Sequence, residues 1–265
     1  RSVVRQPLPV GSPALQELYQ LGQGRDAWDL WQVEFQNRVQ PTVAEQYTDG
    51  IMRLGIGDNL DGIFMLDFLS QREIPEERAE YQALKQQLAY WYALYPFPFL
   101  KPIETWSKQR QLNPILVTAL IRQESRFMPG IRSSVGATGL MQVMPETAAE
   151  VASKINLKQY KLNDPEDNIQ LGTWYLDHTH QEYSNNSLLA VASYNAGPGA
   201  VAGWLQKGVR DPDEFVEAIP YDETKGYVKA VFENYWNYLR LYNPQISQQV
   251  ARYSDNHPTA FKWGF

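Results

Sequence analysis

Apolar residues recur every three or four positions along most of this chain, which is the period of an amphipathic α-helix. In about the first ninety residues the pattern is interrupted repeatedly at glycine and proline, which indicates short helices joined by turns. Alternating patterns typical of strands are scarce. The chain is therefore predicted to be all-α, with the first helices at residues 26–37, 41–54, 59–69 and 75–92.

Two glycine-bearing turns in this part have similar sequences. Residues 21–24 (LGQG) recur as residues 54–57 (LGIG), an offset of 33 that is close to the period of helix-hairpin repeats. A chance match explains two such turns equally well. If the repeat is real, this part is the end of a longer helical array, because two hairpins are too few for a stable solenoid. A chain that opens with Arg1 rather than Met fits that expectation.

A run of aromatic residues and prolines at residues 90–99 (YWYALYPFPF) ends this first part. The prolines break any helix there, so we place a domain boundary in the run. The predicted domains are residues 1–94, a helical hairpin or superhelical region with its linker, and residues 95–265. We interpret the aromatic side chains as packing between the domains rather than as a ligand platform.

One carboxylate interrupts an apolar helical pattern at residues 113–125 (NPILVTALIRQES). Pro114 suits the first position of this helix. Counted from there, Glu124 shares a stripe with three apolar residues, Val117, Leu120 and Ile121. Burial raises the pKa of a carboxyl group, and so does the negative end of the helix dipole in the last turn. A carboxyl that stays protonated near neutral pH is a general acid. The alternative is a Glu124 that is paired with an arginine from another segment.

Composition limits what such an acid could serve. The 265 residues are 43% hydrophobic and 20% charged, as in a globular protein, and no apolar stretch is long enough for a membrane helix. The net charge of −6 gives no general attraction to nucleic acid or anionic lipid. The absence of cysteine excludes disulfides and cysteine nucleophiles. His178 and His180 do not share a helical face and His257 is remote, so neither a metal site nor a cofactor is expected.

Three further segments carry polar groups that helix packing alone does not require. They are residues 133–145 (SSVGATGLMQVMP), 192–199 (ASYNAGPG) and 219–228 (IPYDETKGYV). Each also has an ordinary structural explanation, as a buried loop, a helix-ending turn and a capped helix start.

Taken in order with Glu124-Ser125, these segments resemble the soluble lytic transglycosylases, which cleave bacterial peptidoglycan with a lysozyme-like domain. The resemblance runs from about residue 95 to 241 and includes residues 164–172 (DPEDNIQLG). The family often has alanine where this chain has Ser193. The resemblance implies a lysozyme-like catalytic domain that follows a helical superhelix.

The resemblance also implies a role for each matched residue. Glu124 is the expected catalytic acid and base. Substrate contacts are expected at Ser125 and Ser133 near the scissile bond, at Met141, Gln142 and Met144 along the cleft, at Asn195 for the N-acetyl group, and at Glu223 and Tyr227 to complete the groove. Tyr194 is expected to help hold Glu124 in place.

The first carboxylates that follow Glu124 in sequence, Glu146 and Glu150, are expected to face solvent, so a mechanism with one carboxylate is favoured over the usual pair. The expected reaction is non-hydrolytic cleavage between N-acetylmuramic acid and N-acetylglucosamine, with 1,6-anhydromuramic acid ends. Two alternatives remain: a muramidase of the goose-type lysozyme kind, and a noncatalytic glycan-binding scaffold. The expected partner is the peptidoglycan strand, which places the protein in the periplasm or cell envelope.

Overall fold

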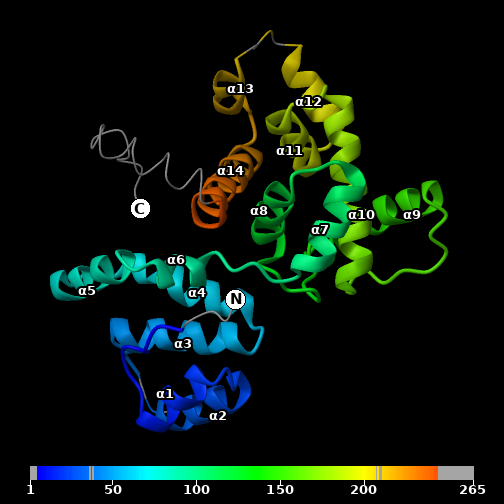
Figure 1. Cartoon of the computed structure of the whole chain (residues 1–265). Helices are drawn as coiled ribbons and strands as arrows, with labels where there is room; N and C mark the ends of the chain where they lie inside the picture. The colour runs from blue at the N-terminus through cyan, green and yellow to red at the C-terminus, as the bar shows by residue number, and fades with distance from the viewer. Residues whose placement is uncertain (1–4, 36, 38, 207, 209–210, 244–265) are drawn as a thin grey trace. The chain divides into compact units, whose positions relative to one another are not determined.

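The computed structural model describes all residues except 1–4, 36, 38, 207, 209–210 and 244–265. Helices dominate, and the described residues contain isolated β-bridges but no sheet (Figure 1). The prediction of an all-α protein is confirmed. The chain forms two compact units, one running to Pro96 and the other beginning at Phe97. None of the helices in the described part is long and apolar enough to cross a bilayer.

The first unit is a series of short helices in which neighbours in sequence pack on one another: α1 on α2, α2 on α3 and α3 on α4 (Figure 1). Their bounds are Pro13–Gln20 (α1), Gly24–Phe35 (α2), Val43–Gly55 (α3), Asn59–Phe68 (α4), Pro75–Lys85 (α5) and Leu88–Leu94 (α6), with a 3-10 turn at Leu69–Gln71 (η1). Caps set several starts. Thr42 and Glu45 form a reciprocal capping box at the start of α3.

Each of the two glycine turns has a left-handed glycine just after its helix, but these glycines are not the pair that the sequence repeat aligns. The sequence alignment pairs Gly22 with Gly55, whereas the left-handed glycines that follow α1 and α3 are Gly22 and Gly57. Gly24 serves another purpose, because a Cβ added there would lie 2.6 Å from the carbonyl oxygen of Gly55. Helices α2 and α3 therefore approach closely at a point where only hydrogen fits.

The predicted helix at 75–92 is wrong in one respect, because it breaks in two at Gln87. The Gln87 backbone is extended, with φ −94° and ψ 126°. The indole Nε1 of Trp91 donates to the carbonyl oxygen of Lys85 at 2.8 Å, and so satisfies a C-terminal carbonyl of α5. A side-chain cap that comes from the following helix is not visible in the apolar period.

The aromatic run around the boundary packs within each unit. Tyr90 is almost fully buried beside Tyr47 in the first unit. Phe97 makes edge contacts with Tyr238 and Tyr242 in the second. Packing between the domains stays a prediction.

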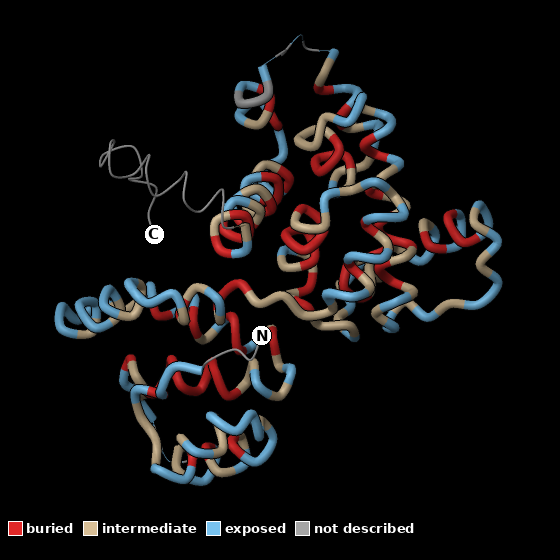
Figure 2. Tube along the Cα trace, viewed as in Figure 1, coloured by how far each residue is buried: buried red, intermediate tan, exposed pale blue. Residues whose placement is uncertain are grey.

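The second unit is built around α8 (Pro114–Ser125), whose buried residues run along its length (Figure 2). Helix α14 (Asp222–Tyr242) packs on α8, and α11 (Ser187–Ala196) packs on both α14 and α10 (Pro165–Glu182). The remaining helices are Leu100–Arg110 (α7), Pro145–Lys154 (α9), Pro198–Leu205 (α12) and Pro212–Ala218 (α13). A long loop that contains two isolated β-bridges joins α8 to α9, and side chains of α8, α10 and α11 form hydrogen bonds with its backbone.

Candidate active site

Glu124 lies in the last turn of α8, where the sequence placed it. Asn113 caps the helix by accepting from the backbone N–H of Ile115 at 2.9 Å, and Pro114 occupies the first turn. Three residues of the predicted stripe, Val117, Leu120 and Ile121, are fully buried. Glu124 itself is half-buried. The helix therefore brings a carboxyl group from the core to a half-buried position at its C-terminal end.

The environment of Glu124 favours its protonated form. Burial raises the pKa of the carboxyl from 4.5 to about 7, and a hydrogen bond from Tyr227 partly opposes this effect. In that bond the Tyr227 hydroxyl donates to Oε1 of Glu124 at 2.6 Å. Among the described residues Glu124 forms no ion pair, and the nearby guanidinium of Arg122 instead donates to Asn234 at 2.9 Å. The alternative of a Glu124 paired with an arginine is therefore not found in the described part of the chain.

Two buried tyrosine hydroxyls lie close to Glu124, one from α14 and one from α11. Burial raises the pKa of Tyr227 and of Tyr194 well above 10, and the charge of Glu124 adds to both shifts. The two hydroxyls have different partners. Tyr227 donates to Glu124, whereas Tyr194 donates to the carbonyl oxygen of Met141 at 2.7 Å. Tyr194 thus fixes the loop beside Glu124, and Tyr227 holds the carboxyl group directly.

A second side chain, this one from α8, also holds the loop between α8 and α9. Ser125 is buried, and its hydroxyl donates to the carbonyl oxygen of Leu140 at 2.8 Å. Because Ser125 follows Glu124 directly, this bond ties the loop to the residue next to the acid.

Asn168 on α10 is a clamp that sequence reasoning did not single out, although it lies in the matched segment 164–172. Its amide nitrogen donates to the carbonyls of Thr138 and Leu162 at 2.9 and 2.8 Å, and its oxygen accepts from the N–H of Met141 at 2.7 Å. The side chain is fully buried. An asparagine in a helix pattern is a weak signal, since only the fold shows that backbone groups need it.

The residues expected along the cleft have different exposures. Met141 is fully buried, and its thioether packs where a Cβ on Gly172 would lie. Met144 is half-buried at the N-cap of α9. Gln142 has a left-handed backbone with φ 49°, and its amide donates to the carbonyls of Gly139 and Ile131 at 3.0 and 3.3 Å. The Gln142 carbonyl oxygen is the part of the amide left for a ligand.

Three other expected residues lie at half-buried or exposed positions. Ser133 accepts from the N–H of Ala137 at 3.0 Å in the loop. Asn195, at the end of α11, is exposed and accepts from the Thr224 hydroxyl at 2.8 Å. Glu223 is exposed in the first turn of α14. In the described residues none of the three has a hydrogen bond to Glu124, so any common role would operate through a ligand.

The two carboxylates of α9 do not form a catalytic pair with Glu124. Glu146 and Glu150 are both exposed, and Glu150 pairs with Lys154 at 2.6 Å. The histidines have other surroundings: His180 is buried between the carbonyl of Leu176 and the hydroxyl of Ser187, and His178 stacks on Trp174. His257 lies outside the described residues.

Replacing Tyr227 with phenylalanine is expected to raise the pKa of Glu124 further. The hydroxyl donates to the ionised carboxylate, so its removal destabilises the charged form. A reaction that needs protonated Glu124 loses rate as the pH rises through that pKa. The pH at which kcat/KM falls by half should therefore move upward in Tyr227→Phe. The control is Tyr235→Phe on the same helix, because the Tyr235 hydroxyl bonds Asn113 rather than Glu124. This variant should leave the pH at which kcat/KM falls by half unchanged. If this pH moves downward in Tyr227→Phe, or moves equally in both variants, Tyr227 does not act on the pKa of the catalytic acid as described.

The geometry can be compared with known proteins. Residues 101–214 match the family described as the Transglycosylase SLT domain. Soluble lytic murein transglycosylases from Salmonella typhimurium and Escherichia coli are 38% and 39% identical over 168 and 160 residues. These matches cover 61% and 57% of this chain, and the chain spans about a quarter of each relative, 25% in both cases.

Solved structures agree. The 70 kDa soluble lytic transglycosylase from Escherichia coli superimposes with a TM-score of 0.67 at 26% identity, over 93% of this chain and 39% of that one. An inactive mutant of lytic transglycosylase Slt from Pseudomonas aeruginosa superimposes with a TM-score of 0.64 at 28% identity, over 89% and 35%.

The predicted resemblance is thus confirmed by sequence and by fold, and the matched domain contains Glu124 and its loop. Residues 101–214 match the Transglycosylase SLT domain, and the chain is similar to the soluble lytic murein transglycosylases over part of its length.

Proposed function

We propose that this protein cleaves peptidoglycan between N-acetylmuramic acid and N-acetylglucosamine as a lytic transglycosylase, with Glu124 as acid and then base. The observation that carries the proposal is one half-buried carboxyl with a pKa of about 7, bonded to Tyr227 and free of ion pairs among the described residues. Such a group holds a proton near neutral pH and can give it up, as a general acid must.

In the first step protonated Glu124 gives its proton to the oxygen that bridges the two sugars. The bond from that oxygen to the anomeric carbon of N-acetylmuramic acid breaks, and the released N-acetylglucosamine gains a hydroxyl. The anomeric carbon becomes electron-poor. Because the described residues place no second carboxylate against Glu124, the acetamido oxygen of the substrate supplies the electron pair and forms a cyclic oxazolinium ion, as in substrate-assisted glycosidases.

In the second step ionised Glu124 acts as the base. It takes the proton of the C6 hydroxyl of the same sugar, and that oxygen bonds to the anomeric carbon as the oxazolinium ring opens. The product is a 1,6-anhydro sugar, and Glu124 is protonated again. Water is not consumed. A pKa of about 7 suits both steps, because the group must donate in one and accept in the other.

The residues around Glu124 have supporting roles in this proposal. Tyr227 positions the carboxyl, while Tyr194 and Ser125 hold the loop at Met141 and Leu140. Side chains proposed to contact the glycan are Ser133, Gln142, Met144, Asn195 and Glu223. Because peptidoglycan lies outside the cytoplasmic membrane, the proposed place of action is the periplasm or cell envelope.

Mass spectrometry of muropeptides released from purified sacculi tests the reaction. Wild-type protein is expected to release products one water lighter than hydrolysed muropeptides, and Glu124→Gln is expected to release none. Hydrated reducing ends would instead identify a muramidase. Equal release by both proteins would remove Glu124 from the mechanism, and glycan retention without any release would indicate a noncatalytic scaffold.

A further inference from the structure

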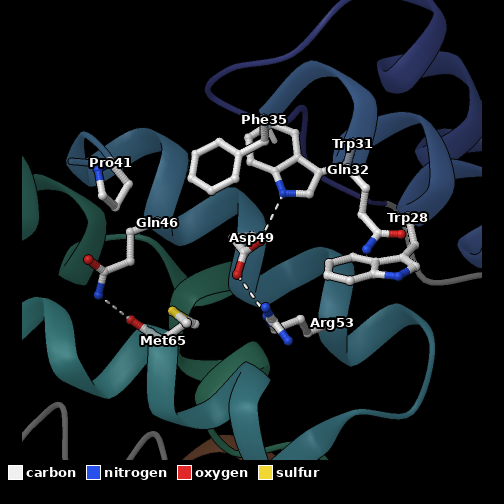
Figure 3. A pocket seen from close by; sticks show the side chains of 9 residues that line it. All are labelled: Trp28, Trp31, Gln32, Phe35, Pro41, Gln46, Asp49, Arg53 and Met65. Carbon is white, nitrogen blue, oxygen red and sulfur yellow. Dashed lines mark hydrogen bonds and ion pairs between the residues drawn. The ribbon is translucent and has the colours of Figure 1, made fainter. Parts of the chain in front are cut away.

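The first unit contains a cavity of about 300 Å³ that plays no part in the reaction proposed above. It lies between α2, α3 and α4, and we call it the Trp28 pocket after one of its walls (Figure 3). Its volume is at the lower end of the range for small-molecule sites, about 300 to 1,000 Å³. A ligand of about one sugar ring suits this size better than a chain of several residues.

The pocket is built from side chains that hold one another in place. Trp31 stacks on Phe35 with ring centroids 4.8 Å apart, and its indole N–H donates to Asp49 at 3.0 Å (Figure 3). The second oxygen of Asp49 accepts from Arg53 Nε at 2.8 Å. The guanidinium of Arg53 lies 5.0 Å from the ring centre of Trp28. A site preorganised in this way loses little freedom when a ligand binds.

Charge in the pocket argues against an anionic ligand. Arg53 is the basic side chain of the lining, and it is already paired with Asp49. It also lies 3.1 Å from Asp58 and 3.6 Å from Asp61. Three carboxylates around one guanidinium leave a negative balance, which repels carboxylate and phosphate groups.

The lining also contains two neutral amides, those of Gln46 and Gln32. Gln46 is fixed, with its nitrogen donating to the carbonyl of Met65 at 2.8 Å and its oxygen accepting from Arg72 at 2.6 Å. Gln32 is exposed and has no hydrogen bond among the described residues. Its amide offers a donor and an acceptor together. Aromatic walls, a fixed carboxylate and a free amide match a ring with an apolar face and neutral hydroxyl edges.

We propose that the Trp28 pocket binds an uncharged N-acetylhexosamine unit, N-acetylglucosamine in the glycan strand. The choice among neutral sugars rests on the proposed function. N-acetylmuramic acid is the poorer ligand, because its lactyl carboxylate meets the negative balance around Arg53. The first unit would then hold a glycan strand at a point separate from Glu124.

The test is a titration of the Glu124→Gln protein with di-N-acetylchitobiose, followed by NMR of ¹⁵N-labelled tryptophan indoles. The Trp31 indole N–H is the reporter because it bonds Asp49 at the pocket. Its signal is assigned with Trp31→Phe. Binding should give a saturable shift of this signal. Trp28→Ala, and separately the exposed Gln32→Ala, should weaken that binding about tenfold, as loss of one good contact does. Trp236→Ala, which removes a 60% exposed indole from the other unit, should not.

No shift of the Trp31 signal would overturn the proposal, and so would equal affinity in Trp28→Ala, Gln32→Ala and the parent protein. Free N-acetylmuramic acid at pH 7 should bind more weakly than N-acetylglucosamine, and the reverse order would overturn the preference for a neutral sugar. The reporter does not depend on cleavage. If wild-type protein releases nothing from sacculi while Trp31 still titrates, the proposed function fails and the sugar pocket stands.

Discussion

Replacing Glu124 with glutamine is expected to lower the rate of peptidoglycan cleavage by about a hundred- to ten-thousand-fold, the usual effect of removing a general acid. Glutamine keeps the shape of the side chain and an oxygen that can accept from Tyr227, whose hydroxyl lies 2.6 Å from the carboxylate. It has no proton to give to the glycosidic oxygen. Glycan binding should persist, so the loss should appear in kcat rather than in KM.

The matched control is Glu150→Gln, which removes an exposed carboxylate whose partner is Lys154. This variant should keep the wild-type rate, because Glu150 is no second catalytic group in a mechanism with one carboxylate. Release of anhydro-muropeptides is measured for both variants beside wild type. A loss in Glu150→Gln as large as that in Glu124→Gln would require a two-carboxylate mechanism.

Glu124→Gln should lower activity but raise the free energy of unfolding. This difference separates a catalytic loss from a folding defect. The pKa of Glu124 is raised from 4.5 to about 7 on folding, so between these values the folded state binds more protons than the unfolded state. Stability falls as the pH rises through this window. Above pH 7 the cost is about 3 kcal/mol.

Glu124→Gln removes that cost. The variant should therefore be more stable than wild type at pH 8 and about equal to it near pH 4.5, as measured by urea unfolding at both values. A variant that is less stable at pH 8 would show that the ionised carboxylate is stabilised in the fold, against the direction of the pKa shift.

Much of α8 could be predicted because its determinants are local. A cap at Asn113, Pro114 in the first turn and an apolar stripe that ends at Glu124 are all visible within thirteen residues of sequence. The start of the helix, its buried face and the position of Glu124 at the end of that face follow from these features. The partner of Glu124 is different in kind, because Tyr227 is distant in sequence and reaches the acid only when α14 packs on α8.

The conformation of the loop between α8 and α9 could not be predicted from the sequence pattern. Its segment could be singled out from its glycines and its Gln142 among apolar residues. Its conformation is set by three side chains from three helices, Ser125, Asn168 and Tyr194, each of which bonds a backbone group of the loop. Such bonds have no period and no fixed spacing. They explain why the hydroxyls of Ser125, expected near the scissile bond, and of Tyr194, expected to hold Glu124, are both occupied by the loop in this structure.

Replacing Gly139 with alanine is expected to destabilise the protein by about 3 kcal/mol and to lower activity with it. A Cβ at this position would lie 2.2 Å from the carbonyl oxygen of Leu162 and 2.3 Å from the amide nitrogen of Asn168. The backbone cannot yield cheaply, because Asn168 also bonds Thr138 and Met141 on either side. Overpacking of this kind costs about 1–3 kcal/mol. The left-handed φ of +82° adds about 1 kcal/mol for any residue with a Cβ.

Gly136 offers a control in the same loop. Its φ of +96° imposes a similar backbone strain, but the nearest atom to an added Cβ is the mobile end of Arg132 at 3.8 Å. Gly136→Ala should therefore show only the strain, about 1 kcal/mol, and should keep most of the activity. Urea unfolding of the two variants measures the difference, which isolates the contact with Leu162 and Asn168. Equal losses of stability in the two variants would mean that the loop can shift at Gly139. In that case Asn168 does not hold the loop backbone at Met141 in place.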